Sequence, residues 1–173
     1  MTALHYAYSM THVHHADGIR SGLSGADSLF ICLNRQGLET ILPHRGEALR
    51  KIDAVFYDSE SPNRLIGIKE VRNDDRDLEG HFPGAPTYPG YAQDEFVCLV
   101  AAALIPLSVE GLKTNPHVVQ KLVRYKKHVQ PGDRLTADVR LDSRRGRFLM
   151  YSGEIRNQNN DVIAVYEKIV GAV

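Results

Sequence analysis

Residues 96–105 read Phe-Val-Cys-Leu-Val-Ala-Ala-Ala-Leu-Ile, and Pro106 closes this apolar run. Alanine and leucine favour helical backbone, so the run predicts a helix. A helix that is apolar on every side has to be buried all round. This requirement decides the fold, because the rest of the chain must pack around the helix and bury its apolar surface.

Strand patterns lie on both sides of this helix. Residues 51–58 and 64–71 form a predicted hairpin, joined by the turn-like residues 59–63. Four further strands are predicted after the helix, over residues 119–127, 134–142, 147–156 and 162–171. The alternation of apolar and polar residues is clearest in 134–142. We therefore expect an α+β fold, in which an antiparallel sheet of about six strands wraps around the central buried helix. One sheet cannot cover that helix on every side, so we expect a dimer in which a second copy covers the rest.

The first part of the chain carries weaker patterns. Residues 28–33 favour a short strand, and residues 37–42 favour one helical turn. Three histidines within residues 12–15 can bind metal, but no acidic or cysteine ligand accompanies them, so a flexible terminus is the preferred interpretation. We predict a partly flexible N-terminal extension over residues 1–36 and one folded domain over residues 37–173.

The composition indicates an ordinary globular protein. The 173 residues are 43% apolar and 24% charged, with a net charge of zero, so overall charge predicts neither nucleic-acid nor membrane binding. Cys32 and Cys98 form neither a metal-ligand spacing nor a disulfide framework, which suggests a reducing compartment. No apolar run approaches a membrane span, and the first residues lack a secretory pattern. We expect a cytoplasmic protein.

Charge is nevertheless unevenly distributed along the chain. Residues 52–112 hold eleven acidic and four basic residues, a balance of −7, whereas residues 113–147 hold ten basic and three acidic residues, a balance of +7. The basic segment is either a solvated sheet face or a docking patch for an acidic or phosphorylated partner.

A loop with three prolines precedes the helix and carries a candidate base. Residues 80–90 read Gly-His-Phe-Pro-Gly-Ala-Pro-Thr-Tyr-Pro-Gly. Histidine exchanges protons near neutral pH, and the prolines limit where His81 can point. Placing a catalytic group in advance is a large part of catalysis.

The start of the helix supplies two further candidate groups. The first backbone N–H groups of a helix lack intrahelical partners, and Gly90 lets a ligand oxygen approach its N–H closely. Such a donor can stabilise an enolate. Asp94 and Glu95 follow, and about 100° separates adjacent helical side chains, so only one of the two faces the core. Desolvation raises the pKa of that carboxyl group and suits it to general acid catalysis.

These residues resemble the active-site segment of the 3-hydroxyacyl-[acyl-carrier-protein] dehydratases of the FabZ type. The similar segments are His81-Phe82-Pro83-Gly84, Pro89-Gly90 with Glu95 six residues after Pro89, Leu42-Pro43-His44-Arg45, Ile68-Lys69-Glu70-Val71, and residues 124–133 with their Pro-Gly-Asp turn. The resemblance covers roughly residues 38–170.

The resemblance implies a hotdog fold, dimeric and often a trimer of dimers. It implies that His81 of one subunit and Glu95 of the other face a shared tunnel, where a (3R)-hydroxyacyl thioester loses water to give the trans-2-enoyl product. His81 then takes the C2 proton, Glu95 assists departure of the 3-hydroxyl, and the Gly90 N–H holds the thioester oxygen. No metal or organic cofactor is needed. Acyl carrier protein becomes the expected partner, docking at Arg124, Lys126 and Lys127.

Several positions depart from the family pattern. Tyr88 replaces an apolar residue, residues 91–94 replace aliphatic ones, and Leu99 replaces a frequent glutamine. Tyr88 and Tyr91 can narrow or polarise the tunnel, so a specialised polyene, aryl-polyene or polyketide substrate competes with a fatty-acid one. With these two tyrosines, Phe82 and Gly90 complete the predicted substrate-binding residues. A hotdog thioesterase and a non-catalytic carrier-binding protein are the alternatives.

Overall fold

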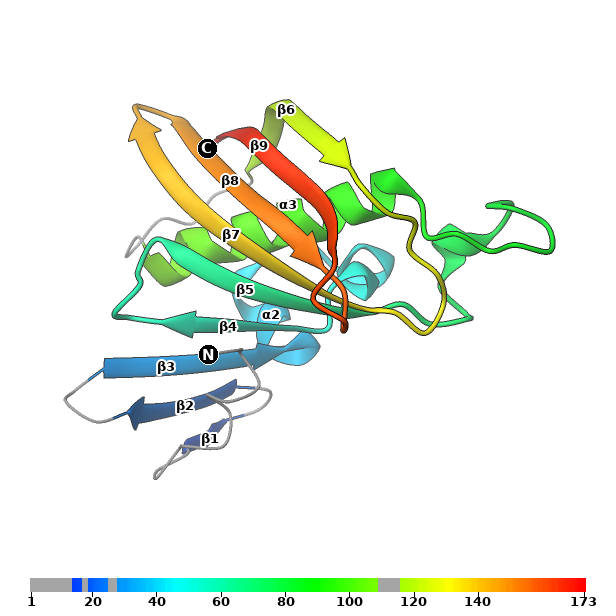
Figure 1. Ribbon diagram of the computed structural model, residues 1–173. Coiled ribbons are helices and arrows are strands. Elements are labelled where there is room, and N and C mark those ends of the chain that lie inside the picture. Colours follow the sequence, from blue (N-terminus) through cyan, green and yellow to red (C-terminus); the bar gives the residue numbers. More distant parts are fainter. Residues whose placement is uncertain (1–13, 17–18, 25–27, 109–115) are drawn as a thin grey trace.

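The computed structural model describes residues 14–16, 19–24, 28–108 and 116–173, with side chains from residue 30 onward. Within these ranges one sheet of nine strands has the order β1-β2-β3-β4-β5-β7-β8-β9-β6, and every neighbouring pair is antiparallel (Figure 1). The strands are β1 (His14–Ala16), β2 (Ile19–Ser24), β3 (Ser28–Asn34), β4 (Ala54–Asp58), β5 (Arg64–Glu70), β6 (His117–Tyr125), β7 (Arg134–Arg145), β8 (Phe148–Arg156) and β9 (Val162–Ala172).

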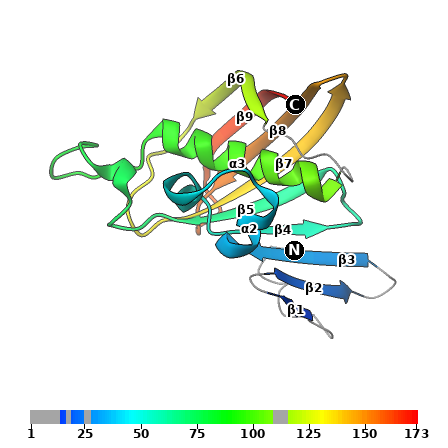
Figure 2. The same cartoon turned by 180° about the vertical axis from the view of Figure 1, so that it is seen from behind.

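Four helical segments accompany the sheet: α2 (Arg35–Ile41), η1 (Gly46–Lys51), η2 (Arg76–Leu78) and α3 (Gly90–Ser108). Seen from both sides, α3 crosses one face of the sheet, and α2 and η1 lie beside it on the same face (Figure 2). This is the predicted arrangement of a sheet around a central helix.

The six predicted strands correspond to β4 to β9, and the expected short strand at residues 28–33 is β3, which pairs with β4. Several boundaries differ from the prediction, and two of the differences have a local cause. The first strand begins at Ala54 rather than 51, because residues 46–51 form η1. The helical turn α2 begins at Arg35, because the Asn34 side chain accepts a hydrogen bond from the Gly37 N–H and caps it.

The N-terminal segment contributes more regular structure than its sequence pattern suggests. β1 and β2 continue the sheet outward from β3. Residues 1–13, 17–18 and 25–27 lie outside the described residues, and the predicted flexibility of this extension falls largely on them. The division of the chain at residue 36 stays a prediction.

Helix α3 is the core of the fold. Most of its side chains from Phe96 to Ile105 are buried, as its apolar surface requires. The helix does not end at Pro106, as predicted, but continues to Ser108. A proline in the last turn removes a single backbone donor, and the Ser108 hydroxyl donates to the Leu104 carbonyl at 2.7 Å. By length and composition α3 also resembles a membrane span. However, 67% of its apolar 18-residue window is buried inside the protein, as in the core helix of a folded domain.

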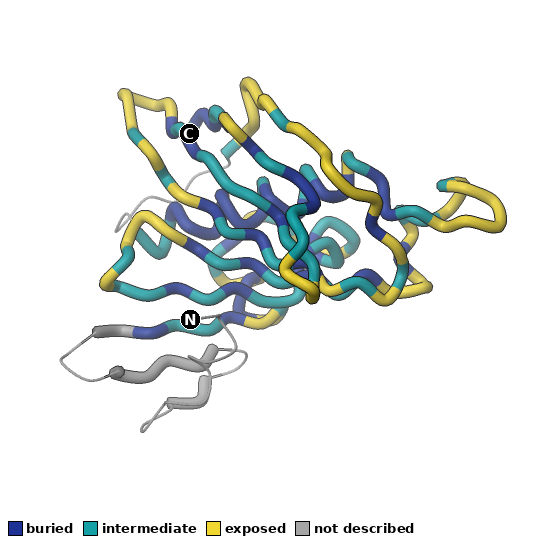
Figure 3. The backbone as a smooth tube through the Cα atoms, viewed as in Figure 1, coloured by how far each residue is buried: buried dark blue, intermediate teal, exposed yellow. Residues whose placement is uncertain are grey.

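One glycine sets how closely the helix lies on the sheet. A Cβ atom added at Gly67 of β5 would lie 2.2 Å from Cγ2 of Val100. A larger residue there has to push α3 away from the sheet. Buried segments gather where α3 crosses the sheet, while the proline-rich loop, β6 and the hairpin tips are exposed (Figure 3).

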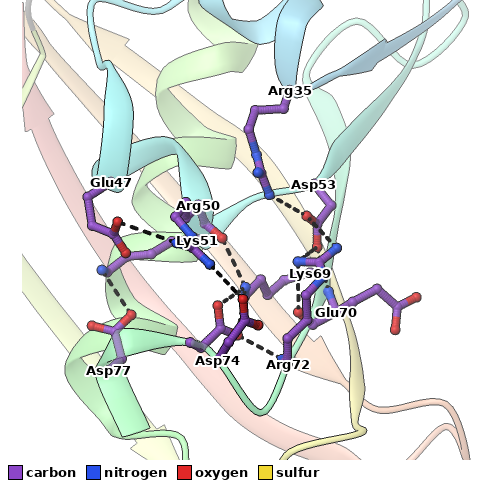
Figure 4. Close-up of polar contacts among 11 residues, drawn as sticks. Arg35, Glu47, Arg50, Lys51, Asp53, Lys69, Glu70, Arg72, Asp74 and Asp77 are labelled. Carbon is purple, nitrogen blue, oxygen red and sulfur yellow. Dashed lines mark hydrogen bonds and ion pairs between the residues drawn. The ribbon is translucent and has the colours of Figure 1, made fainter. Parts of the chain in front are cut away.

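A buried ion pair fixes the base of the proline-rich loop. The Lys69 side chain on β5 is fully buried, and its Nζ donates to the Asp75 carboxylate and to the Arg50 carbonyl, each at 2.9 Å. Asp75 also accepts from the Arg72 N–H at 2.8 Å. An ion pair between Lys51 and Asp77 at 3.0 Å adds a second tie between η1 and η2 (Figure 4).

We expect Asp75→Asn to lower the free energy of unfolding by about 3 kcal/mol, because the charge of Lys69 stays buried without a counter-charge. Urea unfolding measures the change. Asp74→Asn is the matched control: the Asp74 side chain is 73% exposed and its pair with Arg50 is solvated, so its loss costs less than about 1 kcal/mol. Equal effects of the two substitutions would contradict this account.

Candidate active site

The loop between η2 and α3 is held by its own backbone hydrogen bonds as well as by its prolines. The His81 N–H donates to the Leu78 carbonyl at 3.0 Å, and the Thr87 N–H donates to the His81 carbonyl at 2.6 Å. Phe82 and Ala85 bond to each other in both directions, at 3.0 and 3.3 Å. The loop projects from the body of the domain (Figure 1). His81 therefore has a defined position although its loop is exposed.

The surroundings of His81 define which ring nitrogen is available. Nδ1 lies 3.3 Å from the Glu79 carbonyl, which only a protonated nitrogen can satisfy. Nε2 is then the nitrogen with a free lone pair. The ring of Tyr91 lies 5.8 Å from the His81 ring, centroid to centroid, and packs against it. With Nδ1 as the donor, Nε2 is the nitrogen of the neutral ring that can accept a proton.

The start of α3 closes against strand β6. A Cβ atom at Gly90 would lie 2.8 Å from Cζ of Tyr125, so a larger residue there has to displace the Tyr125 ring. The Tyr125 hydroxyl lies 3.3 Å from the Gly90 carbonyl, and its single proton is donated to the closer Asp94 carboxylate at 2.6 Å. Tyr125 therefore forms a wall beside the first turn of the helix.

A cavity of about 430 Å³ lies between the loop, the start of α3 and the end of β6. It brings together most of the residues that the sequence predicted for binding or catalysis. Its lining includes His81, Phe82, Tyr88, Gly90, Lys126 and Lys127. Tyr91 is instead 54% exposed and contacts His81 from outside this lining.

Glu95 lies in a different cavity of the same protomer. That cavity of about 270 Å³ is bounded by α3, by His44 after α2, and by His117 and Val118 at the start of β6. A single protomer therefore does not bring His81 and Glu95 together. The separation is compatible with the expectation that the two residues meet across subunits.

The neighbouring acid, Asp94, has a different environment. Its carboxylate accepts hydrogen bonds from the hydroxyls of Tyr125 at 2.6 Å and Tyr166 at 2.9 Å, and it pairs with Lys121. Burial, together with the charge of Asp94, raises the pKa of both phenols, so they remain donors. Asp94 joins α3 to β6 and β9, whereas Glu95 faces a cavity.

Sequence reasoning missed Gln93 as a site residue. Its side chain is only 4% exposed and lines the His81 cavity. Its Nε2 donates to the Tyr88 carbonyl at 3.2 Å, which fixes the orientation of the amide. Its Oε1 has no hydrogen-bond partner within the described part of the chain. The sequence did contain a signal for this role: Gln93 is polar at a position where the family pattern has an aliphatic residue.

The three predicted docking cations differ in their surroundings. Arg124 pairs with Glu167, and Lys127 pairs with Asp161 at 2.8 Å. Lys126 is exposed and makes no ion pair with the described residues. Lys126 and Lys127 lie at the His81 cavity, but Arg124 does not line it.

The family model for ApeI-like proteins, described as ApeI dehydratase, matches residues 58–164, more than half of the chain. The chain belongs to the ApeI-like dehydratase family.

This ApeI-like chain is also similar to proteins named 3-hydroxyacyl-[acyl-carrier-protein] dehydratase FabZ. The protein of Thermotoga petrophila is 37% identical over 108 residues, which cover 62% of this chain and 75% of the relative. That of Thermotoga neapolitana is 29% identical over 139 residues, covering 80% and 97%. The resemblance found in the sequence is confirmed.

Solved structures confirm the hotdog fold. The dehydratase heterocomplex ApeI:P from Xenorhabdus doucetiae has a TM-score of 0.50 and 19% identity, covering 66% of this chain and 92% of that one. The PaaI protein of E. coli has a TM-score of 0.53 and 18% identity, covering 64% and 76%. A hypothetical thioesterase from Streptococcus pneumoniae has a TM-score of 0.53 and 14% identity, covering 65% and 79%. These likenesses show the fold alone.

We expect Asp94→Leu in this ApeI-like chain to lower the free energy of unfolding by about 2–4 kcal/mol, because the buried hydroxyl of Tyr166 and the half-exposed hydroxyl of Tyr125 both lose their acceptor. Asp94→Asn keeps an acceptor oxygen and loses mainly the pair with Lys121, so about 1 kcal/mol is expected. Chemical unfolding of both variants checks the order. If the two substitutions cost the same, the hydroxyls do not depend on Asp94.

Proposed function

We propose that this ApeI-like chain removes water from a (3R)-hydroxyacyl thioester carried on acyl carrier protein and releases the trans-2-enoyl thioester. Family membership and the similarity to FabZ proteins support the reaction class. The observation that carries the proposal is His81, hydrogen-bonded through Nδ1 and free at Nε2, in a cavity with the N-terminus of α3. A fatty-acid chain and a polyene, aryl-polyene or polyketide intermediate are the candidate acyl groups.

The elimination assigns one role to each group. Nε2 of His81 takes the C2 proton, and the electron pair of that bond forms the C2–C3 double bond. The Gly90 N–H holds the thioester oxygen, where negative charge develops. The C3–O bond breaks, and the Glu95 carboxyl group gives its proton to the departing hydroxyl, which leaves as water. The C2–H and C3–O bonds break, the C2–C3 double bond forms and water leaves with no net oxidation or reduction, so the proposal includes no metal or organic cofactor.

The positions of the two cavities support a site shared between subunits. The His81 cavity lies at the end of β6, beside Tyr125, and the Glu95 cavity lies at its start, beside His117. Pairing two β6 strands antiparallel across a two-fold axis places the end of one beside the start of the other. His81 of each subunit then meets Glu95 of its partner.

The surface of β6 also supports a homodimer. It is the last strand of the sheet order, so its outer edge has no neighbour among the described strands. Val118, Val119, Leu122 and Tyr125 are each 45–54% exposed. A long apolar edge strand is an aggregation hazard unless another strand covers it. A second copy covers it here, alone or within a trimer of dimers.

Lys126 and Lys127 support carrier docking at the His81 cavity, because acidic carriers are attracted to exposed cations. Arg124 is part of the same basic surface but is paired with Glu167. Cytoplasmic localisation stays a prediction.

We expect His81→Ala and Glu95→Gln each to lower kcat for a (3R)-hydroxyacyl carrier thioester at least about 100-fold, the usual contribution of an acid or base. Asp94→Asn is the matched control and retains most of the activity, because Asp94 anchors strands. The ultraviolet absorbance of the enoyl thioester measures the product. Release of free acid and thiol would indicate a thioesterase instead, and no turnover would indicate a non-catalytic carrier-binding protein.

Mixing the two inactive variants tests the shared site. A heterodimer of His81→Ala and Glu95→Gln subunits has one site with both native residues. After random subunit exchange half of the dimers are mixed, so activity returns to about a quarter of wild type. Each variant mixed with itself stays inactive. Failure to recover activity after verified exchange would place both residues in one subunit, and light scattering gives the oligomeric state.

A further inference from the structure

Backbone hydrogen bonds fix the position of His81, but they do not fix the rotation of its ring. Within its own loop the ring has two contacts. Nδ1 lies 3.3 Å from the Glu79 carbonyl, and the Phe82 ring lies 6.0 Å away, centroid to centroid, at an interplanar angle of 67°. Glu79 and Phe82 belong to the same exposed loop and move with it. They cannot hold the His81 ring against the body of the domain.

Tyr91 supplies a contact from outside the loop. Its ring centroid lies 5.8 Å from that of His81, at an interplanar angle of 58°. Tyr91 belongs to the first turn of α3, the helix at the centre of the core. Within the described part of the chain, this is the one ring contact or side-chain hydrogen bond that joins the His81 ring to a helix or strand. Tyr91 does not line the His81 cavity.

The far end of the Tyr91 side chain is anchored. Desolvation, a hydrogen bond to Asp77 and the charge of that carboxylate raise the pKa of the Tyr91 phenol, so its hydroxyl remains a donor. The Asp77 side chain is only 13% exposed and pairs with Lys51 of η1 at 3.0 Å (Figure 4). Asp77 precedes the loop and Tyr91 follows it, so this hydrogen bond ties the two ends of the loop together, with His81 between them.

We propose that Tyr91 is a positioning residue for His81: its ring, anchored to Asp77, holds the His81 ring with Nδ1 toward the Glu79 carbonyl and Nε2 free to take the C2 proton. The inference rests on the proposed dehydratase function. It gives Tyr91 a role that acts through the base, without contact with the substrate. The aliphatic residue of the family pattern offers neither the ring nor the hydroxyl.

Steady-state kinetics with a (3R)-hydroxyoctanoyl carrier thioester separates positioning from substrate binding. We expect Tyr91→Leu to lower kcat about 10-fold to 100-fold, because a base that rotates freely loses part of its contribution. KM changes less than about threefold, because uniform substrate binding is unaffected. Tyr91→Phe keeps the ring and loses one exposed hydrogen bond, so kcat falls only about threefold.

Phe56→Leu is the matched control for the loss of a ring contact. Phe56 lies on β4, outside the lining of the His81 cavity, and its ring centroid is 6.4 Å from that of Phe30. The substitution removes a contact comparable to that between Tyr91 and His81. We expect it to leave kcat and KM unchanged.

The ring ¹⁵N signals of His81 give a readout that needs no turnover. We expect wild-type protein at about pH 8.5, where histidine is ordinarily neutral, to show His81 mainly with its proton on Nδ1. In Tyr91→Leu the ring is free to leave the Glu79 carbonyl, so both tautomers appear. Tyr91→Phe retains the wild-type pattern. The signals lost in His81→Ala identify the ring.

A double-mutant cycle tests the anchor. We expect Tyr91→Phe to lower kcat in the native background and to have no further effect in an Asp77→Ala background, because both substitutions remove the same hydrogen bond. Equal effects of Tyr91→Phe in the two backgrounds would overturn the anchoring by Asp77.

The outcomes separate this inference from the proposed function. If the wild-type protein dehydrates no (3R)-hydroxyacyl thioester, the proposed function fails, and the tautomer spectra alone decide whether Tyr91 orients His81. If Tyr91→Leu keeps the wild-type kcat, raises KM instead, or leaves the His81 spectrum unchanged, the positioning role is overturned while dehydration stands. If Tyr91→Leu does not fold, Tyr91→Phe in the two backgrounds decides the question.

Discussion

The burial of α3 is the constraint on which the rest of this structure depends. A helix that is apolar around its whole circumference is stable in water only when it is covered on every side. The sheet covers one side, and the absence of a side chain at Gly67 allows β5 to approach Val100 closely. α2 and η1 lie beside the helix on the same face (Figure 2). The walls of both cavities are therefore built from α3 and the elements that cover it.

Strand β6 belongs to the sheet that buries α3, and it also borders both cavities of the proposed active site. The strand is bound on one side by β9, and Asp94 of α3 holds it through Lys121 and Tyr125. Its two ends border the two cavities. In the dimer that we propose, an antiparallel partner strand completes the sheet and brings His81 and Glu95 together in one step. In this arrangement assembly precedes catalysis, because neither cavity of an isolated protomer contains both His81 and Glu95.

The sequence predicted the repetitive parts of the fold well. Alternation in 134–142 reports burial through a fixed period, and the continuous apolar run 96–105 indicates a helix buried all round, so strands β4 to β9 and helix α3 were expected. Boundaries were less predictable, since Pro106 is tolerated in the last turn of α3 and η1 replaces the expected start of a strand. The orientation of Gln93 depends on a carbonyl that only the folded loop places nearby. No local pattern encodes such a contact.

Asp94 and Glu95 show how adjacent residues of one type acquire different roles. Their side chains leave the helix about 100° apart, which is enough to reach different surroundings. Asp94 accepts hydrogen bonds from two phenols and pairs with the ammonium group of Lys121. Glu95 lines a cavity whose wall also includes Leu99, Ala102 and Ile105 of α3. A general acid has to exchange its proton in each turnover, and a carboxylate held by several donors is poorly suited to that task. The contacts of Asp94 therefore give it a structural role, and a charged residue at position 94 is compatible with the acid role that we propose for Glu95.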